Sequence, residues 1–96
     1  MAHFLVEYSD IGSAEAREKH RGEHIAYRKG LGDTMRLAGP ILDDAGIAVG
    51  SLVILEADDR AAAGRLAASD PYVSAGVLQV SSVRGYRIAA MKPPQS

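Results

Sequence analysis

The sequence predicts an α+β domain with a ferredoxin-like βαββαβ order, in which two helices cover one face of a four-stranded antiparallel sheet. Four segments rich in strand-forming residues are separated by two segments with helical spacing, and this alternation is the ferredoxin-like pattern. A chain of 96 residues has room for one domain. We expect this domain to span residues 1–91 and residues 92–96 to form a flexible C-terminal tail.

The first half of the chain contains the first strand and the first helix. The segment His3 to Tyr8 (HFLVEY) has the composition of a strand, and Ser13 is a suitable N-cap for a helix that follows it. Gly22 weakens this helix, so we interpret it as a point where another group approaches closely. Residues at spacings of three and four define one helical face: Ala16, His20, His24 (or Glu23), Tyr27 and Leu31.

Two strands follow and form a hairpin. The first, Met35 to Leu42 (MRLAGPIL), contains Gly39-Pro40. Because proline cannot donate to a sheet ladder, we expect a bulge or a strand end at this dipeptide. The turn Asp43 to Gly46 then leads into Ile47 to Glu56 (IAVGSLVILE), which has the strongest strand character in the chain.

The last part of the chain supplies the second helix and the fourth strand. Ala57 to Ser69 is rich in alanine and predicts a helix, which Asp70-Pro71 ends because the residue before a proline avoids helical dihedral angles. We expect one further turn over Tyr72 to Gly76 and a strand over Val77 to Tyr86. A short strand extension over Arg87 to Met91 completes the prediction.

Both faces of the predicted strands carry apolar residues, for example at Leu5-Val6 and over Leu52 to Leu55. An antiparallel sheet with one face in water normally alternates apolar and polar residues. A chain of this length also buries only about 60–65% of its unfolded surface when it folds alone. We therefore predict a homodimer in which two sheets pack face to face as a dimeric α/β barrel.

The composition excludes several classes of protein. Eleven basic and twelve acidic residues give a formal charge of −1, which provides no general attraction to nucleic acid or to an anionic membrane. The absence of cysteine excludes a disulfide framework and thiolate metal sites. The sequence has no signal-peptide pattern, no membrane-length apolar run and no glycine-rich nucleotide loop. We expect a cytoplasmic protein that binds a small molecule and uses no cofactor.

Two histidines four residues apart, His20 and His24, raise the question of a metal site. The string His20-Arg21-Gly22-Glu23-His24 satisfies the H-x-x-E-H pattern of one class of zinc peptidases, and its two histidines share a helical face. Such enzymes need a third protein ligand and a larger scaffold, and the remaining histidine, His3, lies in a predicted strand. We therefore predict no metal site.

The second interpretation of this segment combines His24 with Asp70. An aspartate can fix the tautomer of a histidine, which then serves as a general base. Two helices that lie side by side on one sheet face can bring these side chains together. A purely structural interpretation also stands: Asp70 caps the turn that follows it, and His24 is a hydrogen-bonded core residue. The pattern alone leaves both interpretations open.

Four short motifs, R-x-x-H, A-G-P, G-S and D-P-Y-V-x-A-G, occur in this order along the chain. Over nearly its whole length the chain thereby resembles the YCII-related (YciI-like) proteins of the dimeric α/β-barrel superfamily. The resemblance implies a pocket with a His-Asp pair as catalytic dyad, which falls on His24 and Asp70. It also implies supporting, substrate-binding roles for Arg21, Ser51 and Tyr72.

A dyad of this kind would move protons near neutral pH. Proton transfer suits elimination or isomerisation of a small enol, lactone or quinone-like molecule, and Arg21 would bind a carboxylate or oxyanion of an anionic ligand. The leading hypothesis is therefore a cofactor-free lyase or isomerase. The alternatives are a non-catalytic small-molecule-binding or accessory domain that keeps the pocket, and a cofactor-independent monooxygenase on the same barrel.

Overall fold

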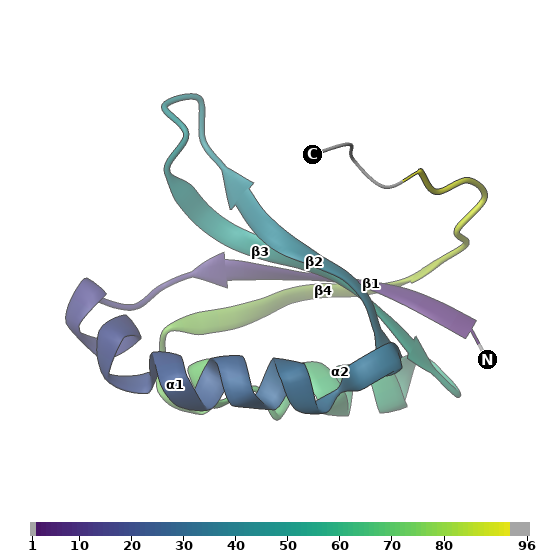
Figure 1. The fold of residues 1–96 in the computed structure, drawn as a ribbon, viewed down its shortest axis with the longest axis horizontal. Coiled ribbons are helices and arrows are strands. Elements are labelled where there is room, and N and C mark those ends of the chain that lie inside the picture. The colour runs from purple at the N-terminus through teal and green to yellow at the C-terminus, as the bar shows by residue number, and fades with distance from the viewer. Residues whose placement is uncertain (1, 93–96) are drawn as a thin grey trace.

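The computed structural model describes residues 2–92 and contains the predicted order of elements (Figure 1). The four strands form one antiparallel sheet in the order β2-β3-β1-β4, which confirms the ferredoxin-like prediction. The elements are β1 (Ala2–Asp10), α1 (Ala14–Gly30), a 3-10 turn η1 (Gly32–Thr34), β2 (Met35–Leu42), β3 (Ala48–Ala57), α2 (Arg60–Ala68), α3 (Pro71–Ser74) and β4 (Leu78–Tyr86).

Side-chain caps fix where the helices begin. The hydroxyl of Ser13 accepts a hydrogen bond from the Ala16 N–H at 3.1 Å, as the sequence predicts for the start of α1. Asp59 caps α2 in the same way through the Ala62 N–H. The short helix α3 begins at Pro71, and its N-cap is Asp70.

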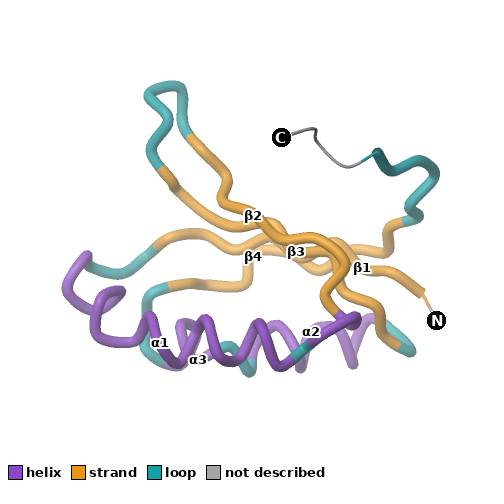
Figure 2. Tube along the Cα trace, viewed as in Figure 1, coloured by secondary structure: helices purple, strands orange, loops and turns teal. Residues whose placement is uncertain are grey.

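The helices lie together on one face of the sheet, and the hydrophobic core lies between the two layers (Figures 1 and 2). Alternate residues of the central strands point toward the helices: Val6 and Tyr8 on β1, and Val53 and Leu55 on β3, are all buried. The buried residues that they meet come from the ends of α2 and α3 and from the start of β4: Ala67, Tyr72, Val77 and Leu78.

Two predicted irregularities are placed differently by the structure. The predicted strand over Arg87 to Met91 is wrong, because β4 pairs only with β1 and that pairing ends at the partners His3 and Tyr86. Strand β2 continues through Gly39-Pro40, and its register shifts lie on either side of this dipeptide. Pro40 is tolerated because β2 is an edge strand, which has a neighbour on one side only. Of the predicted flexible tail, residues 93–96 lie outside the described residues.

Two glycines show opposite steric constraints. A Cβ atom at Gly50, on β3, would overlap the backbone carbonyl of Tyr8 on the neighbouring strand. The corresponding position at Gly22, in α1, has no atom within 4 Å. Gly22 therefore does not serve a close approach, contrary to our interpretation of the sequence, whereas Gly50 permits one.

These constraints predict opposite effects of one substitution. Gly50→Ala should lower the free energy of unfolding by about 1–3 kcal/mol, because the backbones of β1 and β3 would have to separate. Gly22→Ala should raise it by about 1 kcal/mol, because alanine is the better helix former and nothing obstructs its methyl group. Urea denaturation of both variants measures the two values, and a stabilised Gly50→Ala protein would contradict the close approach.

Candidate active site

Helix α1 and the start of α3 bring together an imidazole and a carboxylate from distant parts of the sequence. The Nδ1 atom of His24 lies 2.8 Å from Oδ1 and 2.9 Å from Oδ2 of Asp70. The Asp70 side chain is 1% exposed and that of His24 is 15% exposed. The pair is thus almost removed from water on the carboxylate side and remains reachable on the imidazole side.

Two further donors occupy the same carboxylate. The backbone N–H of Tyr72 donates to Oδ1 at 2.9 Å, and the Nε–H of Arg28 donates to Oδ2 at 3.1 Å. Burial acts to raise the pKa of Asp70, but the hydrogen bond from His24 and the Tyr72 N–H, together with the charges of His24 and Arg28, outweigh it and hold the pKa below 3.8. Asp70 is therefore a carboxylate at neutral pH.

The ionised state of Asp70 determines which nitrogen of His24 carries the proton. A carboxylate only accepts hydrogen bonds, so the contact at 2.8 Å requires a proton on Nδ1. In the neutral imidazole the other nitrogen, Nε2, is then an acceptor. The aromatic ring of Tyr72 stacks on the imidazole, with ring centroids 3.9 Å apart and an angle of 9° between the planes, which fixes the ring orientation.

Arg28 connects the carboxylate to the sheet. Its Nη1 donates to the Ser51 hydroxyl on β3 at 3.2 Å, and the same hydroxyl lies 3.4 Å from the carbonyl of Gly39 on β2. The guanidinium also lies over the ring of Tyr8, 5.3 Å from its centroid. Burial raises the pKa of Tyr8 to about 12, so its phenol stays protonated and donates to the Ala67 carbonyl at 3.2 Å.

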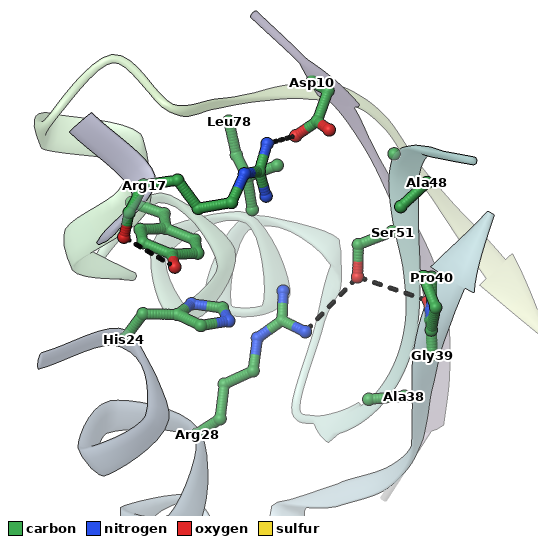
Figure 3. A pocket seen from close by; sticks show the side chains of 12 residues that line it. Asp10, Arg17, His24, Arg28, Ala38, Gly39, Pro40, Ala48, Ser51 and Leu78 are labelled. Carbon is green, nitrogen blue, oxygen red and sulfur yellow. Dashed lines mark hydrogen bonds and ion pairs between the residues drawn. The ribbon is translucent and has the colours of Figure 1, made fainter. Parts of the chain in front are cut away.

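These side chains surround a cavity of about 260 Å³ between α1 and the β2-β3 hairpin (Figure 3). Asp70 itself does not line the cavity and lies buried against the imidazole. Residues with polar side chains provide half of the lining: Asp10, Arg17, His24, Arg28, Ser51 and Tyr72. Small or apolar residues provide the rest: Ala38, Gly39, Pro40, Ala48, Gly50 and Leu78. A volume of this order accommodates a ligand with a single ring.

The structure brings together four of the five residues implied by the resemblance. His24, Ser51 and Tyr72 line the cavity, and Asp70 holds the imidazole. Arg21 does not line it: this side chain is exposed and borders a second hollow, on which His24 and Tyr72 also open.

Sequence reasoning missed three charged residues of the cavity. Arg17 and Asp10 form an ion pair at its edge, and Arg17 also lies over the ring of Tyr72, 5.8 Å from its centroid. Arg28 is the third. Its position four residues after His24, one turn further along the same helical face, is the signal that could have revealed it.

The peptidase-like histidines do not converge on a metal site. The Nδ1 atom of His20 lies 3.8 Å from Oε1 of Glu23. The Nδ1 atom of His24 is instead directed to Asp70. Among residues 2–92 no three histidine or acidic side chains gather as the ligands of a metal ion would. The donor set of this site suits proton transfer and the binding of a polar organic molecule.

Fold and site together define a small ferredoxin-like protein with a carboxylate-held histidine at the wall of a cavity. The YCII-related domain is the family whose sequence profile matches this chain, over residues 1–87. The chain therefore belongs to the YCII-related family.

One solved structure extends the comparison of the fold. It is 5-chloro-2-hydroxyhydroquinone dehydrochlorinase (TftG) from Burkholderia phenoliruptrix AC1100, in complex with 2,5-dihydroxybenzoquinone. The two structures superpose with a TM-score of 0.63 at 22% sequence identity, over 88% of this chain and 91% of that chain. A search of the curated proteins finds no match to this sequence. None of the helices within residues 2–92 has the length and apolar composition needed to cross a membrane.

The lowered pKa of Asp70 predicts how stability depends on pH. A carboxyl group whose pKa is lower in the folded than in the unfolded protein stabilises the fold above its unfolded pKa, near 3.8, and this contribution is lost as the pH falls through the folded value. Asp70→Asn should lower the free energy of unfolding at neutral pH by about 1–3 kcal/mol. It should also flatten the loss of stability below about pH 4. Urea denaturation at several pH values measures both effects, and equal slopes in the two proteins would contradict the assignment.

Proposed function

We propose that this protein is a small-molecule enzyme of the lyase or isomerase type that transfers protons with His24 and works without a cofactor. The observation that carries the proposal is the imidazole itself: Asp70 holds its Nδ1, and the ring lines a cavity of about 260 Å³. A histidine oriented by a carboxylate beside space for a ligand is the arrangement that general acid–base catalysis requires.

In the proposed reaction Nε2 of His24 takes a proton from a carbon or hydroxyl group of the substrate. The electron pair left behind either moves within the substrate, which isomerises it, or expels a leaving group that departs with its own bonding pair. The imidazolium formed is stabilised by the carboxylate of Asp70, 2.8 Å from Nδ1. It then returns the proton to the product or to the leaving group, so that the enzyme ends as it began.

The surroundings of His24 support a small, cyclic and oxygen-rich substrate. The ring of Tyr72 and the side chains of Pro40 and Leu78 offer flat or apolar contacts, and the hydroxyl of Ser51 offers a hydrogen bond. The similarly folded dehydrochlorinase is named for a chlorinated hydroxyhydroquinone and holds a dihydroxybenzoquinone. We extend this class, hydroquinones and related enols, to the present chain as the substrates to test first.

Electrostatics adds one feature to the proposed substrate. Arg17 and Arg28 both line the cavity and would stabilise an oxyanion formed when a hydroxyl group loses its proton. Arg21, which the motif suggests for this role, would meet only a ligand long enough to enter the second hollow.

A non-catalytic ligand-binding or accessory domain is the second candidate, and one observation favours it. Asp70 caps α3 through the Tyr72 N–H, so a structural role accounts for its burial without any reaction. The two candidates differ in their requirement for Nε2 of His24. Recognition needs the shape of the cavity, whereas proton transfer needs the imidazole.

Turnover of 5-chloro-2-hydroxyhydroquinone and of a panel of lactones and keto acids tests the leading candidate. His24→Gln should lower kcat by at least about 100-fold, because the proton acceptor is removed. His20→Gln is the matched control, one turn away on the same helix, and should retain full activity. Turnover that survives His24→Gln would exclude the mechanism, and ligand binding without turnover would favour the accessory role.

We also propose that the active form is a homodimer, in which the sheet face opposite the helices is covered by a second chain. Leu37 on β2, Ile54 on β3 and Leu5 on β1 follow one another across this face. Leu37 lies at the β2 end of this row and is 46% exposed, so a large apolar side chain of the row is open to solvent. Ile54 is already only 7% exposed in the single chain, so a sheet-to-sheet contact would chiefly bury Leu37 and supply part of the apolar area that a chain of this length lacks.

Light scattering of the protein at micromolar concentration tests the dimer. The wild-type chain should have twice the mass of one chain, and Leu37→Glu should be monomeric, because a carboxylate would have to be buried at the contact. Ile25→Glu is the matched control, since Ile25 is 39% exposed on α1, and α1 lies on the opposite face of the sheet (Figure 1). A monomeric wild-type chain would exclude the proposed assembly.

A further inference from the structure

Arg28 is the charged residue of the cavity that contacts the carboxylate of Asp70, and neither the motif nor the proposed reaction accounts for this contact. Its side chain is 15% exposed, and three of its contacts are specific: Nε to Asp70, Nη1 to Ser51 and the guanidinium plane to Tyr8. Nη2 is shielded from solvent and has no acceptor among residues 2–92. Figure 3 shows the guanidinium reaching from α1 past His24 toward Ser51 on the opposite wall. These contacts hold the guanidinium inside the cavity wall, whereas an arginine that only adds to solubility would extend into solvent.

The effect of Arg28 follows from the carboxylate that it shares with His24. A buried aspartate alone beside a histidine favours the imidazolium, because opposite charges attract strongly where water is excluded. An imidazolium has no lone pair on Nε2 and cannot accept a proton. The Nε atom of Arg28 lies 3.1 Å from Oδ2 of Asp70, so the positive guanidinium offsets the negative charge of the carboxylate. Most of the attraction for a second positive charge, on the imidazole ring, is thereby removed.

The other charges around His24 are balanced. Those that line the cavity or the second hollow come from β1 and from α1: Asp10, Arg17, Glu18, Arg21 and Arg28. With the buried Asp70 they make three cations and three anions. Asp10 and Arg17 are paired with each other, and Glu18 and Arg21 are exposed, so that Arg28 is the cation in direct contact with the carboxylate of Asp70.

We propose that Arg28 is a positioning residue, which holds the carboxylate of Asp70 in place and, by balancing its charge, keeps His24 in the neutral form that can accept a proton. The inference deepens the proposed function and rests on it. Arg28 touches Asp70 and acts on the imidazole through it. The catalytic group remains His24.

The test follows the imidazole directly and needs no substrate. NMR spectra of the histidine ring protons, recorded between about pH 5 and about pH 9, give the midpoint of the His24 titration, and His24→Gln assigns the signal. Arg28→Met and Arg28→Gln should move this midpoint upward by about one pH unit, because Asp70 is left uncompensated. Arg28→Lys should keep it close to the wild-type value, because the charge remains.

Lys29→Met is the matched control. It removes one positive charge from an exposed position on the same helix, next to Arg28, and should leave the midpoint almost unchanged. A midpoint that stays in place or moves downward in both uncharged variants would overturn the proposal. Unfolding of both variants, seen by circular dichroism, would also count against it and would assign Arg28 a purely structural role.

The outcome is separate from that of the proposed reaction. If the His24 midpoint moves upward in the Arg28 variants but the wild-type protein turns over no member of the substrate panel, the role of Arg28 is supported and the proposed enzymatic activity is excluded. If the wild-type protein turns over a substrate but the His24 midpoint does not shift in the Arg28 variants, the enzymatic activity is supported and the role of Arg28 is excluded.

Discussion

The site depends on one buried carboxylate. Asp70 is 1% exposed, and within hydrogen-bonding distance it has an imidazole, a guanidinium and a backbone N–H, which come from α1 and from the first turn of α3. Burying an ionised carboxylate without such partners would cost several kcal/mol. Because each partner reduces that cost, the position of α1 over the sheet and the start of α3 are both tied to a single side chain. The geometry of His24 is a consequence of the same constraint.

Much of the fold follows from patterns that are local in the sequence. The strand composition of His3 to Tyr8, the cap at Ser13 and the break at Asp70-Pro71 each correspond to an observed element. The errors have a different origin. Whether Arg87 to Met91 forms a strand depends on a partner, and the pairing of β4 with β1 stops at His3 and Tyr86. Whether Pro40 disturbs a strand depends on that strand being at an edge, which only the strand order decides.

The site could be predicted in part, for a similar reason. The resemblance of the motifs marked His24 and Asp70, and helix packing was sufficient to suggest that they meet. Arg28 carries no motif, and a lone arginine on a charged helix is most simply interpreted as a solvated residue. Its role depends on how close the start of α3 lies to the last turn of α1, a property of the packed structure. Arg21 illustrates the converse: a residue within the motif points away from the cavity, because only one side of α1 faces the sheet.

The double role of Asp70 also decides which side chain can separate function from stability. Its carboxylate caps α3 and orients His24 with the same pair of oxygens, so any change at Asp70 disturbs both at once. His24 is more separable: it lies 15% exposed at the cavity wall, and its loss leaves the Tyr72 N–H and Arg28 still bound to the carboxylate. A structural site would therefore tolerate replacement of the imidazole by an amide, which can also donate to Asp70. A catalytic site would not, because an amide cannot carry a proton away from a substrate. The distinction between an enzyme and a binding domain thus lies in the free nitrogen of one histidine.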